Sequence, residues 1–302
     1  MNRRSFLAGS AALTLCRRAG ADAPNDLIAL WPSQPPNGAG PTEPEHASDG
    51  GSITRVSTPR LIVHRPAQPN HVGVLVIAGG GYAHIELGRE SSPAAAWLAS
   101  LGFAAFELVY RLPGEGWTRD APMQDAQRAL RILRSRAASL AIDADRIGVV
   151  GFSAGGHLAA MTSVRPAAKR YARVDAIDDA SARPDFAALI YPVISMVPPL
   201  NTTHAFRELF RPGASLAEVC SLSPEQLVEA GTPPLFLVHA ADDPTSPVAN
   251  SLAMFQAAKQ RGVPAELHVF PRGGHGFGLG RPASPERAWP ELFAAWVRGL
   301  RS

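Results

Sequence analysis

Residues 145–164, DRIGVVGFSAGGHLAAMTSV, carry the strongest local pattern in this chain. Ile147, Val149 and Val150 form a short apolar run that ends at a glycine, which is typical of a buried strand. The residues after Ser153 are rich in alanine and contain no proline, so they predict a helix that begins directly after the serine. The stretch therefore predicts a strand, a sharp turn and a helix, with Ser153 at the turn.

The pattern Gly-x-Ser-x-Gly around Ser153 has two interpretations. By itself it is a weak signal, because a chain with 27 glycines in 302 residues contains such matches by chance. Between a strand and a helix, the same pattern is typical of a nucleophile elbow, in which small neighbours allow a strained serine to present its hydroxyl. We therefore predict that Ser153 is a nucleophile, and the alternative is a plain glycine-rich turn.

Strand-like and helix-like patterns alternate over the rest of the chain. Helical patterns lie at residues 91–102 and 122–138, and apolar runs that predict strands lie at residues 60–66, 71–81, 103–111, 186–194, 233–240 and 265–271. In the second helix, Leu130 and Leu133 fall on the apolar face, whereas Arg128 falls elsewhere. The alternation predicts an α/β fold with a mostly parallel central sheet and helices on both faces, and an active site at the carboxyl ends of the strands.

The ends of the later strands supply the other groups that a serine nucleophile needs, a base and a carboxylate that orients the base. His275 follows the last strand on the glycine-rich stretch FPRGGHGFGLG, and Asp242 and Asp243 follow the strand before it. Each has an ordinary alternative, since His275 could be a loop histidine and the aspartates could cap the helix that begins near Pro247. The chain order of serine, acid and histidine is that of α/β-hydrolases, so we predict a catalytic triad.

Backbone amides near Ser153 predict an oxyanion hole. Fixed N–H groups without competing charge bind an oxyanion well, and Ala154 directly follows the nucleophile. Gly80 and Gly81 in the stretch AGGGY would let the backbone approach the substrate, unless this is only a glycine-rich turn. Beside it, Tyr82 is expected either to stack on a sugar ring or to pack in the core, and Trp117 is expected to rim the pocket.

Three further features bear on the site. The segment Val197–Leu222 has the pattern of an insertion after a strand and predicts a short cap over the site. His157 lies in the helix behind the serine, where a structural role is expected. The other histidines lack ligand spacing such as His-x-x-x-His with an added acid, so we expect neither a metal nor a cofactor.

The charge of the chain is concentrated at its beginning. Four of the 29 basic residues, Arg3, Arg4, Arg17 and Arg18, lie in the first 21 residues, and without them 25 basic residues face 26 acidic ones. A nearly neutral remainder gives no support to nucleic-acid binding. With 46% hydrophobic residues and no break in composition, residues 22–302 predict one domain with one large core.

Residues 1–21 predict a twin-arginine export signal, and hence a periplasmic or secreted protein, because a paired arginine, Ser-Phe-Leu, a short apolar stretch and Ala-Gly-Ala follow in order. The apolar stretch is too short to span a bilayer, so no permanent membrane anchor is expected. Lipid attachment at Cys16 is the alternative, although Leu15 is bulky for it. After cleavage only Cys220 remains, which we expect to be a small buried apolar residue, and one cysteine suits export in the folded state.

The chain resembles the α/β-hydrolase esterases of the carbohydrate-esterase type, in the acetylxylan or feruloyl esterase-like branch. The matching stretches run nearly from end to end: LWPSQPP, AGGGY, YRLP, DAQRALRILR, GFSAGGHLA, SARPDFAALIYPVISM, HAADDPTSPVANS and GGHGFGLG. In the acid motif of that family the aspartate lies four residues before a proline, and Asp243 has that relation to Pro247, so the resemblance favours Asp243 over Asp242. The chain departs from the family pattern at three positions. Ser33 replaces the usual glycine, Ala78 stands where histidine or proline is frequent, and Ser246 replaces the usual valine.

The resemblance implies a serine esterase that removes small acyl groups, foremost acetyl, from hydroxyls of plant-type polysaccharides or oligosaccharides. An acylated saccharide would then be its partner, with Ser153, His275 and Asp243 as the triad. A general carboxylesterase and a serine peptidase or amidase are alternatives on the same fold, but no acidic pair is evident to anchor a peptide amino terminus. A non-catalytic binding protein would have no physical reason to keep all three triad residues.

Overall fold

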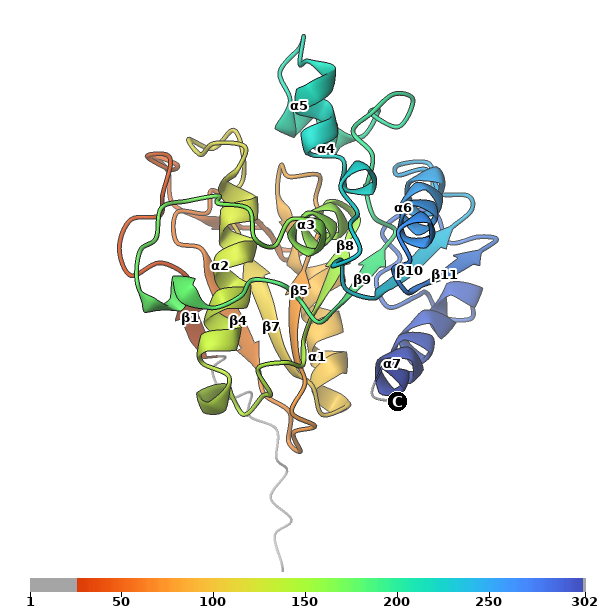
Figure 1. The fold of residues 1–302 in the computed structure, drawn as a ribbon, viewed down its shortest axis with the longest axis horizontal. Helices are drawn as coiled ribbons and strands as arrows, with labels where there is room; N and C mark the ends of the chain where they lie inside the picture. Colours follow the sequence, from red (N-terminus) through yellow and green to blue (C-terminus); the bar gives the residue numbers. More distant parts are fainter. Residues whose placement is uncertain (1–25, 301–302) are drawn as a thin grey trace, which may run out of the picture.

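A twisted eight-stranded sheet forms the centre of the computed structural model, which describes residues 26–300 (Figure 1). Its strands, in spatial order, are β1 (Leu27–Ala29), β4 (Arg60–His64), β7 (Ala104–Val109), β5 (Gly73–Ile77), β8 (Ile147–Phe152), β9 (Phe186–Ile190), β10 (Leu235–Ala240) and β11 (Ala265–Phe270). The strands from β7 to β11 pair in parallel, and β1 and β4 add an antiparallel edge. The predicted mostly parallel sheet is confirmed.

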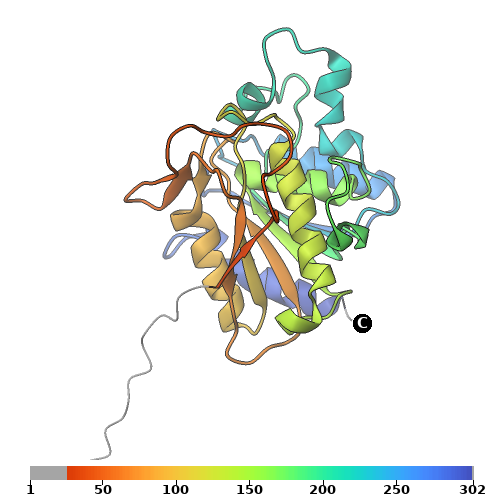
Figure 2. The ribbon, with the colours of Figure 1, turned by 90° about the vertical axis from the view of Figure 1, so that its left-hand side faces the viewer.

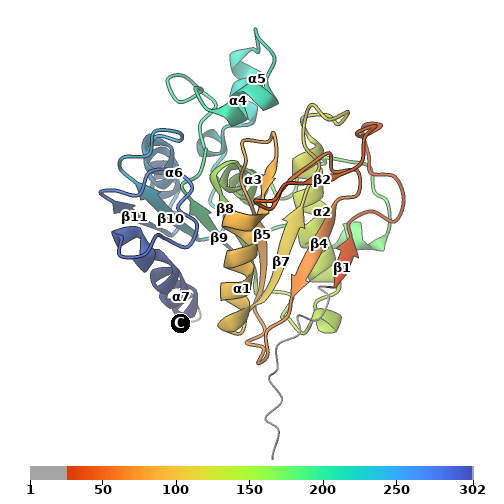
Figure 3. The same ribbon diagram turned by 180° about the vertical axis from the view of Figure 1, so that it is seen from behind.

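Helices cover both faces of this sheet, as predicted (Figures 1 and 3). On one face lie α2 (Ala121–Ser135), α3 (Ser153–Val164) and α6 (Ala249–Gln260). On the other face lie α1 (Ser92–Ser100) and α7 (Trp289–Gly299). The core is accordingly divided into two apolar clusters, one on each side of the sheet.

The middle strands are apolar along their whole length because both of their faces are covered. Every residue of β5 and β8 is buried. Side chains alternate between the faces, so Leu75 and Val149 join the cluster under α2 and α3, whereas Val74 and Val150 join the cluster under α1. This packing fixes the register in which Val149 lies opposite Leu75.

One side chain of α2 lies where the helical pattern did not predict it. Arg128 is buried, although its position was expected to lie away from the packed face. Its guanidinium forms ion pairs with Asp175 at 2.6 Å and Asp178 at 2.9 Å, and its Nε donates to the Leu30 carbonyl oxygen at 2.9 Å. The expectation is wrong because these partners, distant in sequence, compensate the cost of burying the charge.

A cap rises above the carboxyl ends of the strands (Figures 1 and 2). It contains α4 (His204–Leu209) and α5 (Leu216–Ser221), within the segment 197–222 that was predicted as an insertion. The side chains of Thr203 and Ser215 accept hydrogen bonds from the first turns of these two helices. The expectation that Cys220 is a buried residue is wrong, since its side chain in α5 is only partly covered.

The remaining elements are short. A three-stranded sheet joins β2 (His46–Ala47), β3 (Ser52–Thr54) and β6 (Ile85–Glu86) and was not predicted. A π-helical turn, Leu87–Ser91, leads into α1, and 3-10 turns lie at Ala138–Leu140, Ala176–Asp179, Pro224–Gln226 and Pro285–Ala288. Across residues 26–300, each helix falls short of the length and apolarity needed to cross a membrane. The predicted export signal and Cys16 lie outside the described residues.

Candidate active site

Ser153 lies at a sharp turn between β8 and α3, and its backbone is strained. Its φ is 51°, in the left-handed region that residues other than glycine rarely adopt. The turn leaves no room for side chains on two neighbours. A Cβ at Gly151 would clash with the carbonyl oxygen of Gly155, and a Cβ at Gly155 would clash with that of Ile77. The glycines of the motif are therefore required by close backbone approach, as a nucleophile elbow demands.

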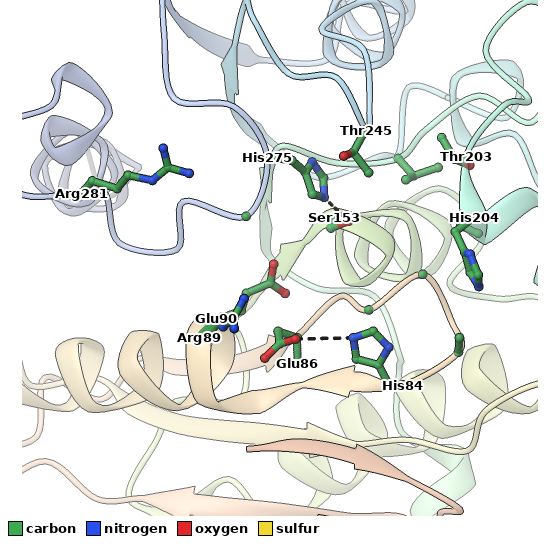
Figure 4. A pocket seen from close by; sticks show the side chains of 16 residues that line it. His84, Glu86, Arg89, Glu90, Ser153, Thr203, His204, Thr245, His275 and Arg281 are labelled. Carbon is green, nitrogen blue, oxygen red and sulfur yellow. Dashed lines mark hydrogen bonds and ion pairs between the residues drawn. The ribbon is translucent and has the colours of Figure 1, made fainter. Parts of the chain in front are cut away.

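Three side chains that were predicted to act together do lie together in the structure. Ser153 Oγ lies 2.8 Å from His275 Nε2, and His275 Nδ1 lies 2.7 Å from Asp243 Oδ2 (Figure 4 shows the first contact). A carboxylate only accepts hydrogen bonds, so Nδ1 carries the proton and Nε2 is free to accept from the serine hydroxyl. The hydrogen bonds thus run in one direction, from Ser153 through His275 to Asp243.

Asp243 is buried and held in its charged form. Oδ1 accepts from the backbone N–H groups of Thr245, at 2.8 Å, and Ser246, at 2.9 Å. Burial raises the pKa of Asp243, but hydrogen bonds from His239, His275 and the Ser246 backbone outweigh it, and the net effect lowers the pKa to about 2. The carboxyl group therefore stays ionised at neutral pH.

Asp242 has a different position. Its side chain is exposed and accepts a hydrogen bond from the Gly274 backbone N–H at 2.8 Å. It therefore tethers the loop that carries His275 without contacting the imidazole. Of the two candidate acids, only Asp243 contacts His275.

The predicted oxyanion residues lie around the serine hydroxyl. Gly80 and Gly81 line the same pocket as Ser153, and their φ values of 109° and 65° turn the loop back on itself. Ala154 directly follows Ser153 in the first turn of α3, where backbone N–H groups have no partner within the helix. The three residues thus lie at or next to the pocket that contains Ser153, and their role as oxyanion donors stays a prediction.

The pocket above Ser153 has a volume of about 540 Å³. The cap contributes Thr203 and His204 to one wall, and the opposite wall carries the charged residues Glu86, Arg89, Glu90 and Arg281 (Figure 4). Two acidic side chains that the sequence did not reveal, Glu86 and Glu90, line the pocket. A volume in this range suits a small organic ligand, and the walls combine apolar surface with a few charged and polar side chains that could orient it.

Neither aromatic residue that was expected to contact substrate lines this pocket. Tyr82 is 0% exposed, and its hydroxyl lies 2.7 Å from His157 Nδ1, so the sugar-stacking alternative is wrong and the core alternative is confirmed. Trp117 is 6% exposed and donates from Nε1 to the Val56 carbonyl oxygen at 2.9 Å. It borders a separate cavity between its own loop and the cap, so the expectation that it rims the site is wrong.

His157 has the structural role that was expected. Its Nε2 donates to the Leu222 carbonyl oxygen at 2.8 Å, which leaves Nδ1 to accept from Tyr82. Burial lowers the pKa of His157 to about 4, so the ring is neutral at physiological pH. The residue thereby joins α3 to the cap.

Within residues 26–300, no group of three or more His, Cys, Asp or Glu side chains is arranged to hold a metal ion.

Sequence reasoning missed Glu90, which borders the pocket beside Ser153. It is 4% exposed, and burial raises the pKa of its carboxyl group to about 7, partly opposed by hydrogen bonds from Gly79 and Tyr191. A glutamate in the stretch GRESSP is ordinary for an exposed helix start, so no local pattern identifies it. Only the three-dimensional arrangement brings it to the nucleophile.

A serine, a histidine and an aspartate, joined in this order at the carboxyl ends of a mostly parallel sheet, define the α/β-hydrolase class. Residues 61–257 match the model of the BD-FAE family. The chain belongs to that family.

Several similar proteins have names that refer to ester hydrolysis or to xylan. The chain is 30% identical over 230 residues to an acetylxylan esterase of Xylanibacter ruminicola, covering 73% of this chain and 44% of that protein. It is 32% identical over 235 residues to endo-1,4-beta-xylanase B of Butyrivibrio fibrisolvens, covering 75% and 34%. The chain thus spans less than half the length of both. A solved acetyl ester-xyloside bifunctional hydrolase from Caldicellulosiruptor lactoaceticus superposes with a TM-score of 0.78 at 34% identity, covering 91% of this chain and 96% of that one.

Proposed function

We propose that this chain is a serine esterase that removes small acyl groups, foremost acetyl, from hydroxyls of plant-type polysaccharides or their oligosaccharides. The observation that carries the proposal is the continuous hydrogen-bond path from Ser153 Oγ through His275 to Asp243, with Ser153 and His275 lining a pocket of about 540 Å³. The names of the similar proteins support the acyl group and the sugar.

The geometry supports acylation of Ser153 in the first half of the reaction. Ser153 Oγ attacks the ester carbonyl carbon while His275 Nε2 takes the hydroxyl proton. Asp243 stabilises the imidazolium that forms and keeps Nδ1 protonated, and it remains ionised throughout. The negative charge on the former carbonyl oxygen is held by the N–H groups of Ala154, Gly80 and Gly81.

The second half returns the enzyme to its starting state. When the tetrahedral intermediate collapses, the bond between the acyl carbon and the sugar oxygen breaks, and His275 gives its proton to that oxygen. Water then attacks the acyl group on Ser153 while His275 accepts a proton from the water. Collapse releases the free acid and returns the proton to Ser153 Oγ.

The substrate class is tested by product release from three polymers: acetylated xylan, feruloylated arabinoxylan and acetylated pectin. We expect acetate to be released from an acetylated polymer by the wild-type protein and not by Ser153→Ala, which serves as the blank. Released acetate is measured enzymatically, and ferulate is measured by its absorbance. If no polymer is deacylated while a small acetate ester is still cleaved, the chemistry at Ser153 stands and the carbohydrate assignment fails.

A serine aminopeptidase is the second candidate, favoured by the two carboxyl groups in the pocket. Both are already engaged, because each oxygen of Glu90 accepts a hydrogen bond, and Glu86 accepts from Ser52 Oγ at 3.1 Å and lies 3.4 Å from His84 Nε2. An amino terminus would have to displace these partners. Alanine para-nitroanilide, added to the substrates above, distinguishes the candidates, since faster cleavage of this amide than of acetate esters would favour the peptidase.

We also propose that the chain acts outside the cytoplasm after twin-arginine export. The support is the paired arginine and short apolar stretch in residues 1–21. Cell fractionation should find the mature protein in the periplasm or medium, and replacement of Arg3 and Arg4 by lysine should retain it inside. An uncleaved cytoplasmic wild-type chain would contradict export and leave the catalytic proposal untouched.

A further inference from the structure

The carboxyl group of Glu90 lies where three loops of the site meet. Glu90 belongs to the π-helical turn before α1, and both of its oxygens are used. Oε2 accepts from the Gly79 backbone N–H at 2.6 Å, and Oε1 accepts from the Tyr191 hydroxyl at 3.0 Å. Within residues 26–300 it forms no ion pair with an arginine or lysine, unlike the buried Asp125, which pairs with Arg111. A buried carboxyl group without a cation partner is costly, and its two hydrogen bonds compensate that cost.

The first oxygen acts on the oxyanion loop. Gly79 directly precedes Gly80 and Gly81, and it is wedged between the serine and the glutamate. A Cβ at Gly79 would lie 2.7 Å from Ser153 Cβ and 3.1 Å from Glu90 Oε2. The hydrogen bond to Oε2 therefore fixes the peptide that sets the distance between the loop and the nucleophile.

The second oxygen acts on the histidine loop through Tyr191. The Tyr191 hydroxyl donates to Glu90 and accepts from the Gly278 backbone N–H at 3.1 Å. The Tyr191 ring packs edge-on against the His275 imidazole, with ring centroids 5.1 Å apart, and against Phe277 at 4.4 Å. Moving the Tyr191 hydroxyl would thus move the loop that carries His275.

We propose, building on the function proposed above, that Glu90 is a positioning residue that couples the oxyanion amides to His275 by hydrogen-bonding Gly79 with one carboxyl oxygen and Tyr191 with the other. The carboxyl group holds the oxyanion loop and the loop that carries His275 at the distance from Ser153 that the reaction requires. Misplacement by a fraction of an ångström at either loop would slow the chemical step more than it weakens binding.

The charge on Glu90 follows pH in the range where the enzyme would work. Burial raises its pKa to about 7, the bonds from Gly79 and Tyr191 and the proximity of His275 oppose this, and Glu86 adds to it. The other ionisable groups near it are Tyr110, Asp243 on the far side of Tyr191, and the pocket residues His84, Arg89, His204 and Arg281. An ionised carboxylate makes stronger hydrogen bonds than a neutral one and favours the imidazolium that forms in the reaction. The charged form therefore positions the site better, and activity rises as the pH passes through about 7.

Glu90→Gln tests the proposal, with para-nitrophenyl acetate as the probe. We expect kcat to fall about 10- to 100-fold with KM changed less than about threefold, because the lost contacts align groups that act in the transition state. We also expect the pH profile to lose the contribution of Glu90, since glutamine does not ionise, and to keep the dependence on an unprotonated His275 that the proposed mechanism requires. The matched control is Glu107→Gln, which alters another buried carboxyl group that bonds Ser91 and Ser92 outside the pocket and should leave both kcat and the pH profile unchanged.

Each outcome has one meaning. A folded Glu90→Gln protein with wild-type kcat and an unchanged pH profile would overturn the positioning role. If that variant does not fold, Tyr191→Phe removes only the hydroxyl between Glu90 and Gly278 and should lower kcat at constant KM, and a wild-type kcat there would also overturn the role. Activity retained in Ser153→Ala would instead contradict the proposed function on which the role rests.

Discussion

Ser153→Ala should lower kcat/KM for para-nitrophenyl acetate by about 10,000-fold or more. The substitution removes the oxygen that forms the covalent bond with the acyl group in the proposed mechanism, and within residues 26–300 no other hydroxyl hydrogen-bonds His275 Nε2. The residual rate would come from the oxyanion amides acting on water. Initial rates at several enzyme concentrations measure the loss.

The variant should remain folded, because alanine keeps the Cβ and adds no strain at a φ of 51° beyond that of serine. Its far-ultraviolet circular dichroism and melting temperature serve as the control. A folded variant that loses less than about tenfold would exclude Ser153 as the nucleophile.

Asp243→Asn should have the second largest effect, a loss of about 10,000-fold in kcat. An asparagine amide can donate to His275 Nδ1 and so stabilise the wrong tautomer, in which Nε2 carries the proton and cannot accept one from Ser153. It also removes the negative charge that stabilises the imidazolium. The effect should appear in kcat at neutral pH, where the ionised Asp243 of the wild type is fully present because its pKa is lowered to about 2.

Asp242→Asn is the matched comparison, with the same chemical change one residue away. The asparagine oxygen can still accept from the Gly274 N–H, and the side chain is exposed, so we expect a loss of less than about tenfold. Kinetics of both variants on the same ester decide between the two acids. The reverse ranking would show that Asp242 orients the base.

Much of the fold could be predicted because the evidence for it is local. The apolar runs of β5 and β8 and the glycines beside Ser153 follow from burial on two faces and from close backbone approach. His275 and the pair Asp242 and Asp243 could be found because parallel strands end at one edge of the sheet, so residues after those strands must meet there. The choice of Asp243 within that pair came from the resemblance to a known family. The chain order then distinguished this fold from other serine hydrolases.

The failures share a cause, which is dependence on partners that are distant in sequence. Arg128 is buried because Asp175 and Asp178 come from another part of the chain. Tyr82, for which the sequence left two alternatives open, is buried with His157 as the partner of its hydroxyl. Trp117 lies away from the site because its Nε1 donates a hydrogen bond to the Val56 carbonyl oxygen. Glu90 was missed because its contacts with Gly79 and Tyr191 form only in the folded chain, and the side-chain pattern of the sequence gives no sign of them.

The central claim is that Ser153 forms a covalent acyl-enzyme, and covalent trapping tests it most directly. The protein is incubated with diethyl para-nitrophenyl phosphate and then digested with a protease. The masses of the resulting peptides are measured by mass spectrometry. The account predicts one phosphoryl group per chain, located on the peptide that contains Ser153, with loss of esterase activity in proportion to labelling. Labelling at another residue, or esterase activity that persists in fully labelled protein, would contradict it.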